Sequence, residues 1–202
     1  MPKKIIFFDF DGVIVNTFFD AYNIMRQTNP NLTEDEYRQI FNTGVYRSIQ
    51  QDGIVPVDNF FDQYDAKIVH DPVKDGIAPL LPDLAKDFTL VIISSTYTAS
   101  IKRYLDENNL SEYFTQVLGG DVDHSKTNKI RRVLADTGID AVQSILITDT
   151  SGDVIEAESA GVKSIAVSWG YQDKQTLQKS HAVVVVDDVD QLEREIRDNF
   201  KL

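Results

Sequence analysis

The sequence predicts an α/β fold: a doubly wound (Rossmann-like) parallel sheet with a small α-helical cap inserted after the first strand. Three observations lead to this prediction. Several short runs are almost continuously apolar, as strands buried on both faces of a parallel sheet are. Apolar residues at helical spacing separate the later runs, which indicates alternating strands and helices. Residues 11–87 separate the first run from the second, and this interval is too long for one crossover helix.

The strand signal occurs six times. We expect strands at Lys4–Phe10, Phe88–Ser94, Thr115–Gly119, Ser144–Thr148, Lys163–Val167 and Ala182–Val186. The end of the chain has a helical pattern instead, with apolar residues at Val189, Leu192, Ile196 and Phe200. A helix should therefore follow the last strand.

The long interval after the first strand has helical signals of its own. Thr33 and Glu36 have the spacing of a capping box, and Val57–Val69 carries aromatic and aliphatic residues at helical spacing. Gly76–Pro79 has the composition of a return linker. We therefore predict a helical cap at residues 17–77 and a core formed by residues 1–16 and 78–202.

The composition excludes several kinds of site and partner. The chain contains no cysteine, which excludes disulfides, thiolate zinc sites and cysteine nucleophiles. Its formal net charge of -12 repels nucleic acid and anionic membranes. Asp9 and Asp11 interrupt the first apolar run too early for a signal peptide, and no run is long enough to span a membrane. We expect a cytoplasmic protein that binds neither nucleic acid nor a membrane.

The candidate site lies where the strands end. Ligands of open α/β sheets bind beyond the carboxyl ends of the strands. Three predicted strand ends, together with the start of a predicted helix, bring four aspartates, a serine pair and a lysine to this edge: Asp9, Asp11, Asp149, Asp153, Ser94, Ser95 and Lys126.

The aspartates predict a magnesium site. Strand alternation places the side chains of Asp9 and Asp11 on the same side, and two carboxylates this close repel each other unless a cation neutralises them. Asp149 and Asp153 add to the acidic cluster. A hard divalent cation that takes few carboxylates together with water and phosphate oxygens fits Mg²⁺. The alternative is that these aspartates only cap turns and helix starts.

The serines and the lysine predict a phosphate site. Ser94 and Ser95 can bind phosphate through a hydroxyl and through backbone N–H groups at the start of the next helix. Their alternative role is a simple helix N-cap. Lys126 can hold Asp9 and a phosphoryl group together as a point charge, and Lys129 is the alternative lysine.

These residues resemble the motifs of the haloacid dehalogenase superfamily. The run Asp9–Thr17 is similar to its first motif, Ser94 to the second, Lys126 to the third, and Asp149 with Asp153 to the fourth. The predicted cap stands where small helical caps of that superfamily are inserted, as in its phosphoglycolate-phosphatase-like members. The sequence departs from the usual motif residues at four positions: Asn16, Ser95, Thr127 and Thr148.

The resemblance implies a phosphatase. Asp9 would attack phosphorus and form an aspartyl-phosphate, and Asp11 would act as the acid and then as the base. Mg²⁺ would be held by Asp9, the backbone carbonyl of Asp11 and Asp149, with Asp153 supporting the site. The phosphoryl oxygens would be bound by Ser94, Ser95 and Lys126.

Other functions of the same residues stay open. A phosphomutase or a pyrophosphatase would use the same core, and a phosphoryl-accepting receiver-type domain also combines an acidic pocket with a hydroxyl residue and a lysine. A protein that binds but does not catalyse is a further alternative, which the intact Asp9 and Asp11 disfavour.

The substrate is expected to be a small phosphorylated metabolite. Four cations of the cap are candidates to bind a second anionic group: Arg26, Arg38, Arg47 and Lys67. Arg47 is the first choice, because it follows Gly44 in a predicted loop. Nothing in the sequence indicates the oligomeric state.

Overall fold

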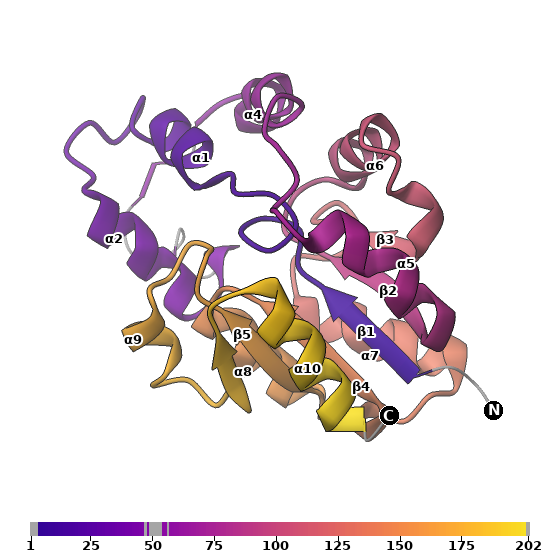
Figure 1. Ribbon diagram of the computed structural model, residues 1–202. Helices are drawn as coiled ribbons and strands as arrows, with labels where there is room; N and C mark the ends of the chain where they lie inside the picture. Colours follow the sequence, from indigo (N-terminus) through magenta and orange to yellow (C-terminus); the bar gives the residue numbers. More distant parts are fainter. Residues whose placement is uncertain (1–3, 47, 49–53, 56, 201–202) are drawn as a thin grey trace.

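The computed structural model describes residues 4–46, 48, 54–55 and 57–200, and it contains a six-stranded, all-parallel sheet (Figure 1). The order of the strands across the sheet is β3-β2-β1-β4-β5-β6. The strands are β1 (Lys4–Phe8), β2 (Phe88–Ile93), β3 (Phe114–Leu118), β4 (Ser144–Thr148), β5 (Lys163–Val167) and β6 (Val184–Val186). The predicted fold class is therefore confirmed.

Helices cover both faces of the sheet, which explains why the strands read as continuous apolar runs. One face packs on α5 (Ile77–Asp87), α6 (Thr98–Glu107) and α10 (Val189–Phe200), and the other packs on α7 (Lys126–Thr137) and α8 (Ser151–Ser159). Alternate residues of β1 serve the two faces: Ile6 and Phe8 belong to the first core cluster, Ile5 and Phe7 to the second. A short helix, α9 (Lys174–Leu177), precedes β6.

Strand β1 ends earlier than predicted. It stops at Phe8 rather than Phe10, because the Phe10 N–H donates to Oδ1 of Asp9 and no longer to a neighbouring strand. Gly12 then adopts a left-handed conformation with φ 72°, which turns the chain. Asp9 and Asp11 are therefore loop residues at the carboxyl edge of the sheet.

Helices fill the interval between β1 and α5. They are α1 (Phe18–Met25), α2 (Glu34–Gln39), the 3₁₀ helix η1 (Ile40–Asn42) and α4 (Phe60–Ile68). The capping box of Thr33 and Glu36 is present as predicted, and α4 lies within the predicted helical segment. Gly76–Pro79 is not a linker throughout, because Ile77 already begins α5. The division into a cap at 17–77 and a core remains a prediction.

The inserted helices lie beyond the carboxyl ends of the strands (Figure 1). The two connections to them run side by side, since Val15 and Val73 form an isolated bridge and the Lys74 N–H donates to the Ile14 carbonyl at 2.8 Å.

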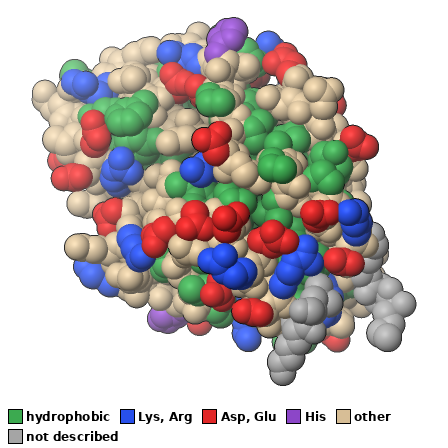
Figure 2. Space-filling model, in the orientation of Figure 1, with side chains coloured by type: hydrophobic (Ala, Val, Ile, Leu, Met, Phe, Trp, Pro, Cys, Tyr) green, Lys and Arg blue, Asp and Glu red, His purple; other side chains and the backbone are tan. Residues whose placement is uncertain are grey.

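Within the described residues, no helix has the length and apolar character that crossing a membrane requires. The face of the molecule in Figure 2 carries acidic and basic side chains interspersed with one another.

Candidate active site

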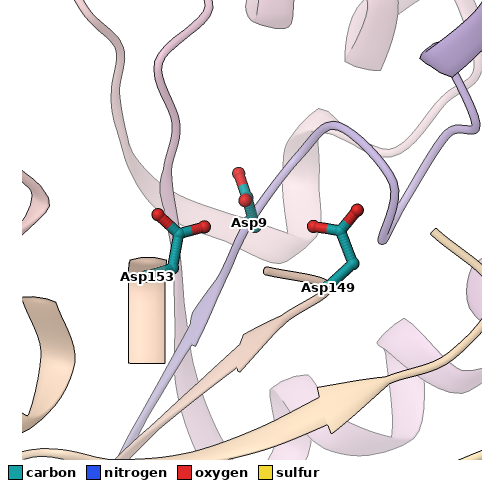
Figure 3. Close-up of side chains that lie close together, drawn as sticks. All are labelled: Asp9, Asp149 and Asp153. Carbon is teal, nitrogen blue, oxygen red and sulfur yellow. The ribbon is translucent and has the colours of Figure 1, made fainter. Parts of the chain in front are cut away.

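Three buried aspartates meet at the carboxyl edge of the sheet (Figure 3). Asp9 follows β1, Asp149 follows β4, and Asp153 lies in the first turn of α8. Because β1 and β4 are neighbours, with the Asp9 N–H donating to the Ile147 carbonyl at 2.9 Å, their ends meet. One carboxylate oxygen from each aspartate lies within 4.8 Å of the other two.

Lys126 binds two of these three carboxylates. Its Nζ donates to Oδ2 of Asp9 at 2.6 Å and to Oδ2 of Asp153 at 2.7 Å, and all three side chains are buried. The Ser125 hydroxyl caps α7 at this point and fixes where the helix begins. Of the two candidate lysines, Lys126 is thus the one that contacts Asp9. Lys129 instead donates to the backbone carbonyls of Ser94 and Gly119.

The third carboxylate is only half satisfied. Asp149 Oδ2 accepts the Tyr171 N–H at 2.6 Å, whereas Oδ1 is buried and has no hydrogen-bond partner among the described residues. Burial raises the pKa of Asp149 to about 7. A Cβ on Gly12 or Gly170 would lie 1.8 or 2.3 Å from Asp149 Oδ2, so only glycine leaves room for this carboxylate.

These features fit a divalent metal ion. A buried carboxylate oxygen without a partner is costly unless a cation binds it. Burial also raises the pKa of Asp9, against the opposing effect of Lys126, so a second cation would favour the ionised carboxylate that a nucleophile needs. Among the described residues, Lys126 pairs with two of the three carboxylates and Asp149 has no ion pair, which leaves excess negative charge for a metal to balance.

Asp11 lies in a separate environment of hydroxyl groups. Its Oδ1 accepts from Thr17 at 2.8 Å and also from the Tyr64 hydroxyl, while its Oδ2 accepts from Thr96 at 2.8 Å and from Ser94 at 3.3 Å. The carboxylate of Asp11 does not belong to the group of three formed by the other aspartates. The two members of the first motif therefore have separate partners, which suits separate chemical tasks.

Sequence reasoning missed the hydroxyl groups around Asp11. Thr17 ends the run that resembles the first motif, and Thr96 follows Ser95 in the sequence, but neither was assigned a role. A hydroxyl residue within or next to a motif is the signal that could have identified them. Tyr64 reaches Asp11 from α4 of the insertion, across 53 sequence positions. No local pattern predicts that contact.

A cleft of about 1200 Å³ opens above the aspartates. Asp9, Asp11 and Asp149 line its floor, and residues of the insertion line its other walls. Ser95 is a lining residue, whereas Ser94 is fully buried, with its hydroxyl accepting the Thr96 N–H at 3.0 Å. In this arrangement Ser95 faces the cleft and Ser94 supports it from below.

Two stacked aromatic pairs join the insertion to the loops that follow β2 and β3. The rings of Tyr46 and His124 lie 4.0 Å apart at 8°, and those of Phe61 and Tyr97 lie 3.8 Å apart at 21°. The Tyr46 hydroxyl also donates to the Ser95 carbonyl at 3.0 Å. These contacts hold the insertion over the strand ends.

The predicted substrate residue Arg47 lies outside the described residues. The other candidate cations of the insertion have partners elsewhere. Arg38 lies 3.9 Å above the Phe18 ring and donates to the Tyr171 carbonyl, and Lys67 pairs with Asp20 at 3.3 Å. Arg26 donates to the Pro30 carbonyl.

Comparison with known proteins identifies the family. Residues 6–167 match the family described as haloacid dehalogenase-like hydrolase, and the chain belongs to this family. The predicted resemblance is confirmed, and so is the prediction that the chain is an enzyme of the hydrolase class.

Several curated relatives match at low identity. A protein named "Probable phosphatase IndB" from Dickeya dadantii is 33% identical over 123 residues, which cover 59% of this chain and 52% of that relative. This chain thus spans about half of that relative. The phosphoglycolate phosphatase of Caulobacter vibrioides is 29% identical over 84% of this chain and 81% of its own length.

A predicted phosphatase from Clostridium acetobutylicum has a similar crystal structure. Its TM-score is 0.80 at 24% identity, over 98% of this chain and 100% of that one. At this identity the likeness shows the fold alone.

The unpartnered oxygen of the buried Asp149 carboxylate should lower the stability of the metal-free protein. Asp149→Asn should raise the melting temperature in chelator by about 2–4 °C, or about 1 kcal/mol, because it removes a buried, half-satisfied carboxylate. Addition of Mg²⁺ should then stabilise the wild type and leave the variant unchanged. Differential scanning fluorimetry measures both effects.

Asp190→Asn is the matched control, because Asp190 is exposed on α10. It should respond to Mg²⁺ as the wild type does. Equal stabilisation of Asp149→Asn and wild type by Mg²⁺ would contradict the metal site.

Proposed function

We propose that this protein is a Mg²⁺-dependent phosphatase that hydrolyses a small phosphate monoester through an aspartyl-phosphate on Asp9. The observation that carries the proposal is the buried Asp9 carboxylate, bound by Lys126 at 2.6 Å at the floor of the cleft. Family membership supports the reaction class, and the phosphatase names of the relatives support the phosphoryl group as the part transferred.

The first step is attack by Asp9 on phosphorus. The bond between phosphorus and the alcohol oxygen breaks, and Asp11 gives that oxygen its proton. Lys126 and the Ser95 edge of the cleft face the phosphoryl oxygens, where negative charge is spread. Ser94, below this edge, holds the Thr96 N–H through its hydroxyl.

The second step is hydrolysis of the aspartyl-phosphate. Asp11, now a carboxylate, takes a proton from water, the water oxygen attacks phosphorus, and the bond to Asp9 breaks to release inorganic phosphate. The hydroxyl groups of Thr17 and Thr96 fix the orientation of Asp11 for both proton transfers.

Magnesium would be held by Asp9, Asp149 and the backbone carbonyl of Asp11, with Asp153 holding Lys126 beside them. When bound, it would offset the repulsion between the carboxylate nucleophile and the phosphate dianion. The oxygen-only donor set suits Mg²⁺ better than a softer metal.

The substrate is proposed to be a small phosphorylated metabolite. Phosphoglycolate, named in several relatives, carries a carboxylate besides its phosphate. Among the described residues that line the cleft, Lys126 is the one lysine or arginine, and two carboxylates already engage it. Recognition of a second anionic group would therefore fall to Arg47, which directly follows the cleft residue Tyr46 in the sequence.

Family membership does not support the receiver-type alternative. A phosphomutase on the same core would return the phosphoryl group to a sugar instead of water. Release of inorganic phosphate from a panel of phosphorylated metabolites, assayed with Mg²⁺, separates the phosphatase from the mutase.

Asp9→Asn tests the nucleophile. The substitution keeps the shape and removes the attacking charge, so kcat on any hydrolysed monoester should fall by about 10³-fold or more. Asp190→Asn should keep full activity. A turnover by Asp9→Asn within tenfold of wild type would refute covalent catalysis.

Arg47→Ala tests substrate recognition. KM for an anionic metabolite should rise about tenfold or more, while turnover of p-nitrophenyl phosphate stays close to wild type, because that ester offers no second anionic group. Arg194→Ala, on the exposed surface of α10, is the control. Unchanged kinetics on both substrates would remove Arg47 from the site.

A further inference from the structure

Lys129 is a buried lysine to which the proposed reaction gives no task. Its side chain is 0% exposed, and it lies near the start of α7, three residues after Lys126. Its Nζ donates to the Ser94 carbonyl at 2.6 Å and to the Gly119 carbonyl at 3.2 Å. It therefore joins the two loops that follow β2 and β3.

Its ammonium forms no ion pair with any residue that the structure describes. Burial and the nearby Lys126 lower the pKa of Lys129 to about 8, whereas Asp9, Asp153 and Glu156 oppose this shift from a distance. A buried cation that contacts only carbonyls is costly in the free protein. Such a charge is offset when an anion binds close by.

The peptide between Ser94 and Ser95 connects this charge to the cleft. None of the described peptide bonds is cis, so the Ser94 carbonyl and the Ser95 N–H point in opposite directions. Because the Ser94 carbonyl accepts a hydrogen bond from Lys129, the Ser95 N–H points away from the lysine. The Ser95 N–H donates to no other described residue, and Ser95 lines the cleft.

We propose that Lys129 is a positioning residue of the phosphate site, which holds the Ser94 carbonyl and thereby directs the Ser95 N–H at the phosphoryl group. The ammonium also polarises this peptide, which strengthens the N–H as a donor. The inference rests on the proposed function for the identity of the bound group, but it concerns binding rather than turnover. The two lysines thus have different roles. Lys126 binds the nucleophile Asp9, and Lys129 binds the Ser94 carbonyl in the loop that faces the phosphate.

The test is phosphate binding by Lys129→Met, which keeps the length and removes the charge. In Mg²⁺, inorganic phosphate should raise the melting temperature of wild type, and about tenfold to a hundredfold more phosphate should be needed for the same shift in the variant. Lys102→Met, exposed on α6, should match wild type.

A chemical rescue separates charge from packing. Because the chain has no cysteine, Lys129→Cys can be alkylated in denaturant with 2-bromoethylamine and refolded, which restores an ammonium at nearly the same reach. The alkylated protein should recover phosphate binding, and iodoacetamide treatment should not restore it. Wild type treated with each reagent controls for refolding.

The outcomes distinguish this inference from the proposed function. Equal phosphate stabilisation of wild type and Lys129→Met would overturn the role of Lys129 even in an active phosphatase. A wild type that is stabilised by phosphate more than the variant, yet hydrolyses no monoester, would support Lys129 and refute the phosphatase. A wild type that phosphate does not stabilise would overturn the role of Lys129, whereas the phosphatase is refuted only by the absence of monoester hydrolysis.

Discussion

The buried Lys126 ammonium binds two of the three buried carboxylates at the strand ends, and the other features of the site follow from this unequal pairing. Lys126 binds Asp9 and Asp153, and Asp149 is left with an unpartnered oxygen. Such an arrangement is unfavourable for the stability of the free protein, because buried charge without compensation costs free energy. It is favourable for catalysis, because a divalent cation and a phosphoryl group can complete the balance of charge.

A small number of residues position these charged side chains at the edge of the sheet. The neighbouring parallel strands β1 and β4 end at the same edge of the sheet. The aspartates that follow the two strands, Asp9 and Asp149, therefore lie close together. Gly12 and Gly170 keep the space that Asp149 occupies, and α7 brings Lys126 in from the second face of the sheet. The inserted segment lines the walls of the cleft and makes two aromatic contacts to the core. It also provides the Tyr64 hydroxyl that donates to Asp11.

The sequence predicted what depends on local pattern. Apolar runs located all six strands, and the polar residues after them located Asp9, Ser95, Asp149 and Asp153 at the same edge. It could not choose between Lys126 and Lys129, because the two lysines lie three residues apart on one helix and their partners come from distant parts of the chain. It also missed Tyr64, because that contact depends on how the insertion docks. The predicted end of β1 was two residues too late, because the Phe10 N–H donates to the Asp9 side chain and not to a neighbouring strand.

The proposed catalysis requires Asp9 to carry the phosphoryl group during turnover. The most direct measurement is rapid-quench trapping of Asp11→Asn with Mg²⁺ and a monoester that has a good leaving group, followed by peptide mass spectrometry. A good leaving group needs little protonation, so the first step should survive while hydrolysis of the intermediate slows. We expect a phosphorylated peptide with the modification on Asp9. Phosphate on another residue, or turnover by Asp11→Asn with no covalent adduct at any quench time, would contradict it.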